Sequence, residues 1–342
     1  MLRIVGDINL SDGFFDTGFG IGSELKKGKD PFQNLNRDVE DLWFGNMECV
    51  ISDLSNKSSI YSKQFRISPS NVKHIHHLDI YNIANNHVMQ HGAEAYKDMI
   101  ANLDSLSVKS VGSNKNKSIT ISHQSKSIGI LSFSQRDEKF SDNPSYWYDP
   151  EYKQIEEEFL SIKDNDFKIA YIHWGNEFIN KPYGDQKKFG HWLIDLGFDL
   201  IIGLHPHVLQ GFEVYKNKYI FYSLGNFVFN MPATATKYSC IVNVDLSSEK
   251  PKIDYDYIVK GEDYWPQIIS ENKVPEQFSF PFLNSLTSHE VENEVYYQSV
   301  FNEISKYRKS NYKYIFNSIF KYRKKDLLEI LMDFGKRRIS KK

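Results

Sequence analysis

Residues 199–207 read Asp-Leu-Ile-Ile-Gly-Leu-His-Pro-His, an apolar run that ends directly in two imidazole side chains. Such a short run beside a turn is typical of a buried strand, and Pro206 fixes the backbone angle between His205 and His207. We therefore expect both imidazoles on one side of a strand-end loop, where they can ligate a metal ion. An accidental exposed His-x-His pair is the alternative.

Further short apolar runs, separated by amphipathic segments, predict strands that form sheets covered by helices, an α/β fold class. Loops at the ends of such strands converge on one edge of a sheet. The expected strands are residues 2–5, 42–44, 80–83, 128–133, 169–172, 200–202, 219–222 and 241–244.

Several of these runs end in groups that bind metals. Asp7 follows the first run, and the preceding Gly6 allows close approach of other backbone or of a metal. Asn46 and Glu48 point to the same side if the backbone is extended, and their oxygens can ligate a divalent ion. Plain polar turns are the alternative at both places.

Three consecutive polar residues, Asn85, Asn86 and His87, follow the run at 80–84. His173 follows Lys168-Ile169-Ala170-Tyr171-Ile172, with Glu177 four residues later. A turn and a hydrogen-bonded structural histidine are the respective alternatives. In the company of the other strand-end groups we favour a site.

Asn226, in the stretch 223–227, completes the series of strand-end groups. Oxygen and imidazole ligands without thiolate suit Mn, Fe or Zn, and their number suffices for two ions that share a bridging carboxylate. We expect Asp7 and His205 in strand-end loops and not in the core, so that alanine at either position abolishes metal binding and leaves the fold largely intact.

In order and spacing, these motifs resemble those of the CapA capsule-synthesis family, which is similar to the calcineurin-like metallophosphoesterases. The resemblance covers roughly residues 1–245. It is carried by Gly6-Asp7, Gly45-Asn46-Met47-Glu48, Ala84-Asn85-Asn86-His87, His173-Trp174-Gly175-Asn176-Glu177, Gly203-Leu204-His205-Pro206-His207-Val208 and Tyr222-Ser223-Leu224-Gly225-Asn226-Phe227.

The resemblance implies a metallophosphoesterase β-sandwich flanked by helices, with two divalent ions at one edge. It gives His87 the catalytic role of general acid or charge stabiliser and Glu48 that of bridging carboxylate. The implied metal ligands are Asp7, Glu48, Asn86, His173, His205 and His207. Substrate-binding or supporting positions are Asn46, Asn85, Glu177 and Asn226.

Two positions depart from the family pattern. Gln90 stands where the family usually has an aspartate three residues after the histidine, so His87 lacks the carboxylate that would orient it and raise its pKa. Phe178 stands where a tyrosine is common. The first departure bears on acid catalysis, whereas the metal-ligand set is complete.

Bulk properties exclude some partners and suggest a compartment. Forty-four acidic residues against 42 basic ones give a net charge of −2, which argues against nucleic acid as a partner. Cys49 and Cys240 are far apart and suit a reducing compartment. The sequence has neither a secretory signal pattern nor an apolar run of about 18 residues, so we expect a cytoplasmic protein.

We expect two parts, the metallophosphoesterase-like domain at 1–265 and a mostly helical extension at 266–342. The last 38 residues hold thirteen Lys or Arg and three acids. An apolar stripe at helical spacing accompanies them and predicts either an interfacial helix on an anionic membrane or a helix packed on the main domain. The stripe is Tyr312, Ile315, Phe316, Ile319 and Phe320.

Taken with the resemblance, the sequence favours a metal-dependent hydrolase or transferase of the phosphoesterase type. By resemblance to the family, which is linked to poly-γ-glutamate and capsule production, it would act in synthesis of a surface polymer. Its substrate would be an anionic small molecule or polymer, and capsule-synthesis enzymes are its expected partners. The alternative is a non-enzymatic scaffold or accessory protein with a degenerate metal site, which Gln90 favours.

Overall fold

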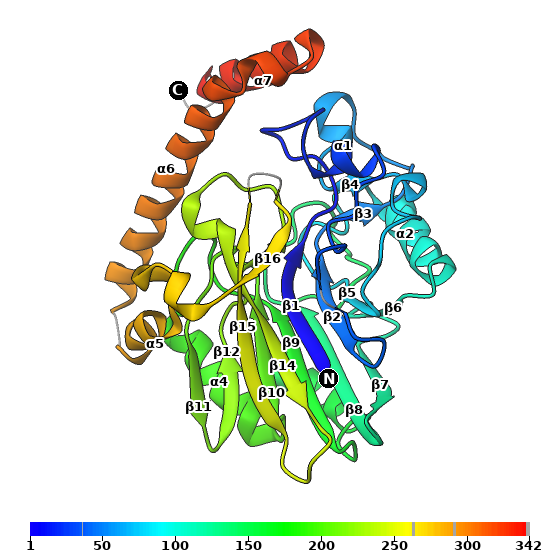
Figure 1. Cartoon of the computed structure of the whole chain (residues 1–342), viewed down its shortest axis with the longest axis vertical. Coiled ribbons are helices and arrows are strands. Elements are labelled where there is room, and N and C mark those ends of the chain that lie inside the picture. The colour runs from blue at the N-terminus through cyan, green and yellow to red at the C-terminus, as the bar shows by residue number, and fades with distance from the viewer. Residues whose placement is uncertain (36, 262–263, 290–291, 340–342) are drawn as a thin grey trace.

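The computed structural model describes residues 1–35, 37–261, 264–289 and 292–339. Two β-sheets pack face to face, and helices cover their outer faces (Figure 1). The predicted α/β class, a sandwich flanked by helices, is therefore confirmed. All eight expected strands are present, six of them within longer elements, whereas the expected strands at 80–83 and 219–222 each extend one residue past the observed end.

The first sheet contains eight strands among the described residues, with β1 near its centre. Strand β1 pairs in parallel with β2 and β13 and antiparallel with β14. In spatial order the sheet consists of β16 (Pro266–Ile269), β15 (Lys252–Lys260), β14 (Tyr238–Asp245), β1 (Leu2–Ile8), β2 (Leu42–Met47), β5 (Ile80–Asn82) and β6 (Lys109–Val111), and β13 (Asn226–Val228) lies beside β1.

The second sheet has a parallel centre, β8–β9–β10–β12, and an antiparallel strand at each edge. Its order is β11 (Phe212–Tyr215), β12 (Lys218–Phe221), β10 (Leu200–Leu204), β9 (Phe167–His173), β8 (Lys126–Ser134) and β7 (Ser118–His123). A small parallel pair, β3 (Val50–Ile51) with β4 (Arg66–Ile67), lies apart from both sheets.

A buried apolar layer joins the two sheets. The rings of Phe44 in β2 and Tyr171 in β9 lie 4.1 Å apart, and the Tyr171 hydroxyl donates to the Val5 carbonyl oxygen at 2.6 Å. This layer fixes the strand ends of one sheet against those of the other. Helices α1 (Ile21–Leu25) and α2 (Ala93–Ser105) contribute to the core beside the first sheet, and α3 (Tyr152–Phe159) and α4 (Gly184–Leu196) to the core beside the second.

Close backbone contact beside β1 depends on Gly6. A Cβ atom at this position would lie 1.8 Å from the Gly225 carbonyl oxygen, which accepts the Asp7 N–H at 3.0 Å. The expectation that Gly6 permits close approach of other backbone is therefore confirmed. This contact brings the segment before β13 directly against the end of β1.

The C-terminal part is mostly helical, as expected, with α5 (Phe280–Ser288), α6 (Asn293–Asn317) and α7 (Lys324–Ile339). Strand β16 pairs with β15, so the first sheet takes up four residues beyond position 265. Helix α6 runs along one side of the domain and α7 turns across its end (Figure 1). Within the described residues, none of the helices combines the length and apolar character that a bilayer-spanning helix needs.

The apolar stripe of the C-terminal segment is divided between two environments. Ile315 is buried against Ile60, Tyr322 and Ile330. Phe316 and Phe320 are 76% and 98% exposed. Packing on the main domain therefore accounts for only part of the stripe.

Candidate metal centre

The carboxyl ends of the central parallel strands meet at one edge of the sandwich, because β1, β2 and β5 run in the same direction in one sheet and β9 and β10 do so in the other. Asp7 lies in β1, Glu48 directly follows β2 and His173 ends β9. His205 and His207 follow β10. The structure thus brings together side chains that lie up to 200 positions apart in the sequence.

Glu48 lies at the middle of this cluster. Its Oε1 atom is 3.8 Å from Nε2 of His87, 3.8 Å from Nε2 of His173 and 3.7 Å from Nε2 of His207. Both carboxylate oxygens are buried, and neither has a hydrogen-bond partner among the described residues. A buried carboxylate in such surroundings requires a cation or a proton.

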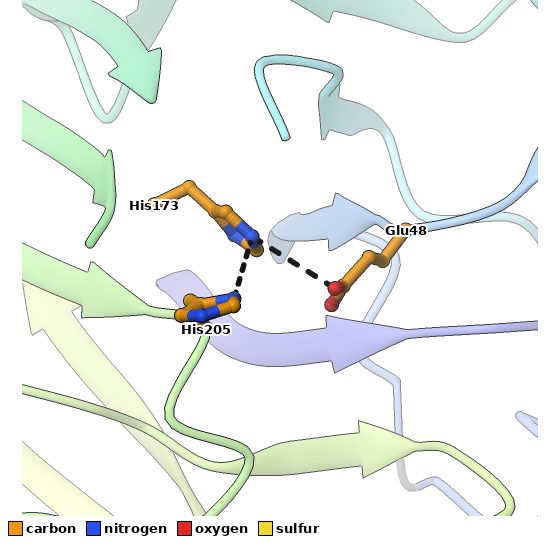
Figure 2. Close-up of side chains that lie close together, drawn as sticks. All are labelled: Glu48, His173 and His205. Carbon is orange, nitrogen blue, oxygen red and sulfur yellow. Dashed lines mark hydrogen bonds and ion pairs between the residues drawn. The ribbon is translucent and has the colours of Figure 1, made fainter. Parts of the chain in front are cut away.

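The histidine rings converge on each other as well as on the carboxylate (Figure 2). Nδ1 of His205 lies 3.1 Å from Nε2 of His173. Nε2 of His173 also lies 2.9 Å from Oδ1 of Asn86. The other ring nitrogen of His205 is buried without a partner among the described residues. Lone pairs directed at one place are the arrangement that a metal ion requires.

Two groups of side chains have ligand atoms close enough to hold an ion, and they share Glu48. One consists of Glu48, His173 and His205, and the other of Asp7, Glu48 and His207. Within each group the ligand atoms lie within 4.8 Å of one another. The residues present therefore fit divalent metal ions, with Glu48 in the shared position.

Burial sets the protonation of these groups. Desolvation lowers the pKa of His173 and of His205 well below the usual value, and neighbouring histidines and Arg136 add to this effect. Desolvation, together with the charges of Asp7 and Glu177, raises the pKa of Glu48. Neutral imidazoles are the form in which histidine ligates metals.

A network of asparagine side chains holds the Asp7 carboxylate and the His207 ring. Asn46 donates from Nδ2 to Oδ1 of Asp7 at 2.8 Å, and its own Oδ1 accepts from Asn82 at 2.7 Å and from Asn85 at 3.1 Å. Asn226 lies 2.9 Å from Nδ1 of His207, so the other nitrogen of that ring faces Glu48. Asn46 and Asn226 therefore orient Asp7 and His207 for metal binding.

One expectation about these residues is wrong. Asp7 and His205 are 0% and 1% exposed, so they belong to the interior and not to loops outside the core. Strands β13 and β2 flank the end of β1, where Asp7 lies opposite Asn226 on one side and Asn46 on the other. His205 and His207 also have φ of 91° and 59°, a strained backbone that surrounding packing has to maintain.

His87 lies at the rim of the cluster. Its Nδ1 atom is 2.7 Å from Oε1 of Gln90, and its ring stacks on Phe65 with centroids 3.6 Å apart. Burial lowers the pKa of His87 to about 3. The ring is therefore neutral at pH 7, with Nδ1–H donated to Gln90 and the Nε2 lone pair directed toward Glu48.

Three residues near the centre were not expected from the sequence. Asn82 donates to Asn46, Arg136 donates to the Gly175 carbonyl at 2.5 Å close to the histidines, and the side chain of Lys260 is buried and interacts electrostatically with Asp7. Glu177, which was expected there, is partly exposed and acts on Glu48 by its charge. An Asn within a strand, an Arg in a loop and a Lys in a distant strand carry no local signal of such a role.

Comparison with known proteins identifies relatives. The chain is 36% identical over 184 residues to the capsule biosynthesis protein CapA of Bacillus anthracis, a match that covers 49% of this chain and 44% of that protein. It is 34% identical over 180 residues to the PGA biosynthesis protein CapA of Bacillus subtilis, covering 49% and 47%. The chain thus spans less than half the length of these two relatives.

Among solved structures, a phosphatase from Mycoplasma pneumoniae aligns with a TM-score of 0.44 at 12% identity, covering 75% of this chain and 92% of that one. The family model described as bacterial capsule synthesis protein PGA_cap matches residues 2–231. That stretch contains every proposed metal ligand. The chain belongs to this family of bacterial capsule synthesis proteins.

Proposed function

We propose that the protein is a metal-dependent hydrolase or transferase of the phosphoesterase type that acts in the synthesis of a capsular or other surface polymer. The observation that supports this most directly is the buried, unpartnered Glu48 carboxylate with three imidazole nitrogens within 3.8 Å. Family membership supports the link to a surface polymer.

Two divalent ions, Mn, Fe or Zn, would be held by the two groups that share Glu48, with Asn86 as a further ligand through its Oδ1 atom. Bound there, such ions would supply Lewis-acid activation of water and charge neutralisation for an anionic substrate. Asp7 and Glu48 provide the balancing negative charge. Asn46, Asn85 and Asn226 keep the ligands in place.

His87 would face the substrate from the rim. With Nδ1–H donated to Gln90, its Nε2 atom can accept a hydrogen bond or a proton. A pKa of about 3 makes it a poor proton donor at neutral pH, because almost no imidazolium is present. The chain is therefore suited to reactions in which the leaving group needs little protonation.

The uncharged Gln90 also favours a second candidate function, an accessory or scaffold protein that retains the fold and the metal ligands without turnover. Capsule-synthesis enzymes would be its partners. Cytoplasmic action, proposed for either function, is supported by the two buried thiols, Cys49 and Cys240, neither of which forms a disulfide.

One experiment separates the two functions. The full-length protein is purified, its Mn, Fe and Zn are measured, and hydrolysis of a generic phosphodiester and a phosphomonoester is followed with and without added metal. Metal-stimulated hydrolysis that is lost in Glu48→Gln supports the enzyme. Bound metal without hydrolysis leaves the accessory function, and protein that takes up no metal contradicts the proposed enzyme.

A further inference from the structure

Helix α6 has two different faces. Tyr296, Asn311 and Ile315 are no more than 7% exposed and face the domain, whereas Phe301 and Phe316 are 70% and 76% exposed. Positions three or four apart share one side of a helix, so Tyr307 lies on the inner side with Asn311 and Ile315. The inner face lies over loops that follow the metal-centre strands.

Tyr307 links this face to the metal centre. Its ring stacks on Phe178 with centroids 3.9 Å apart, and Phe178 in turn lies 6.3 Å from the ring of His207. Burial raises the pKa of both Tyr307 and Glu48, and the charge of Glu177 adds to the shift in each case, so this carboxylate is close to the helix and to the metal centre. Near the start of α6, Asn176 donates to the Tyr296 hydroxyl at 3.3 Å.

Other aromatic rings lie beside His87 at the rim and beside the buried His207. Phe65 stacks on His87 at 3.6 Å, and Phe140 lies 6.4 Å from the same imidazole. Phe229 lies 4.8 Å from the ring of His207. Together these rings form an aromatic collar, which we define as Phe65, Phe140, Phe178, Phe229 and Tyr307.

Polar groups accompany the collar on the side of the helix. Asn311 contacts the Tyr307 hydroxyl, and its Oδ1 atom is buried without a hydrogen-bond partner among the described residues. An unpartnered acceptor requires a donor, such as a hydroxyl or an N–H group. Glu177 disfavours a second anionic group at this place because like charges repel.

We infer that α6 is part of the substrate site, and that Tyr307 and Asn311 complete a subsite for a neutral, hydroxyl-bearing ring attached to the anionic group that reacts. The inference rests on the proposed function. Flat apolar faces of a sugar ring fit against aromatic side chains, its hydroxyls satisfy Asn311, and the anionic group remains for the metal centre. Tyr307 and Asn311 lie outside residues 2–231, the part of the chain that matches the family model.

The first test needs neither metal nor activity. Carbethoxylation of His207 by diethyl pyrocarbonate is followed by mass spectrometry in the metal-free full-length chain, with exposed His74 as internal reference. Tyr307→Ala should speed modification of His207 by about threefold or more, because local access governs the rate. Tyr307→Phe and the exposed control Phe301→Ala should match wild type. Equal rates in all four proteins would overturn the placement of α6 over the centre.

The second test measures binding of glucose 1-phosphate, inorganic phosphate and 3-phosphoglycerate to the Mn-loaded protein by calorimetry. We expect glucose 1-phosphate to bind most tightly, and Tyr307→Ala to weaken it by up to about tenfold without affecting inorganic phosphate. Equal affinities for the two phosphate esters, or an equal loss for all ligands, would overturn the ring subsite. If no ligand binds and no metal is taken up, the proposed function fails, whereas the modification test still decides whether α6 covers the centre.

Discussion

The Nδ1 atom of His87 lies 2.7 Å from Oε1 of Gln90, an uncharged partner. Burial lowers the pKa of His87 more than the hydrogen bond to the uncharged amide raises it, because an amide stabilises an imidazolium less than a carboxylate does. Burial then determines the protonation state and lowers the pKa of His87 to about 3. Gln90 is therefore the residue that determines whether His87 can act as an acid.

Replacing Gln90 with Asp should convert His87 into a better proton donor. The new carboxylate accepts the same hydrogen bond and raises the pKa of His87, so activity that requires the imidazolium persists to higher pH before it falls. We expect phosphodiester hydrolysis at neutral pH to rise on the order of tenfold. The pH dependence of kcat/KM measures this, with Gln90→Leu as the variant that loses the contact. Unchanged activity in a correctly folded Gln90→Asp protein would show that His87 is not the acid.

Gly6→Ala should destabilise the fold strongly, since the added Cβ would lie 1.8 Å from the Gly225 carbonyl oxygen. Overpacking of this kind against backbone costs about 2–4 kcal/mol in the free energy of unfolding. Denaturant unfolding monitored by circular dichroism measures it. Gly184→Ala is the control, because no heavy atom outside the adjoining backbone lies within 4 Å of the added group. A Gly6→Ala protein as stable as this control would contradict the close packing of β1 and β13.

The environment of His91 predicts that the folded protein loses stability at acid pH. Its Nε2 lies 2.7 Å from the Gln64 carbonyl and its Nδ1 lies 2.7 Å from the Ser55 hydroxyl, so the ring is neutral, donating to the first and accepting from the second. Burial lowers its pKa from 6.5 to about 4. The stabilisation is thus present above pH 6.5 and is lost as the pH falls toward 4.

Between about pH 7.5 and about pH 5, wild type should lose about 2 kcal/mol more free energy of unfolding than His91→Gln, which cannot titrate. Urea unfolding at the two pH values gives both numbers. Identical pH dependence of the two proteins would mean that His91 titrates normally in the folded chain.

Much of the fold follows from local sequence, whereas the supporting residues of the site do not. Apolar runs identify eight of the strands because burial on both faces of a sheet requires such runs, above all in its parallel part. Two-residue strands such as β3 and β4 offer no periodic pattern. The roles of Asn82, Arg136 and Tyr307 depend on which strands and helices become neighbours, and that is determined by packing between distant segments. Ligands at strand ends are predictable because topology brings those ends together.

The exposed part of the C-terminal stripe predicts peripheral binding to anionic membranes. Phe316 and Phe320 point to solvent, with Lys313, Lys321 and Lys324 nearby in the sequence. Each cation near an anionic surface contributes about 1 kcal/mol. The full-length chain should therefore sediment with phosphatidylserine liposomes at low salt and less so at high salt.

Point variants test this better than truncation, because α6 also packs on the domain through Ile315. Phe316→Ser combined with Phe320→Ser should abolish sedimentation, and Leu160→Ser, an exposed residue of the main domain, should not. Wild-type protein that remains in the supernatant at low salt would refute membrane binding.

The central claim is that Glu48 is shared by the ligands of a divalent metal centre. Equilibrium titration of the metal-free, full-length chain with Mn²⁺, followed by electron paramagnetic resonance, tests it directly. We predict saturable binding of about one to two ions per chain, lost in Glu48→Gln and retained in Glu94→Gln, whose carboxylate lies on the surface. Absence of saturable binding in wild type, or equal binding by Glu48→Gln, would contradict the account.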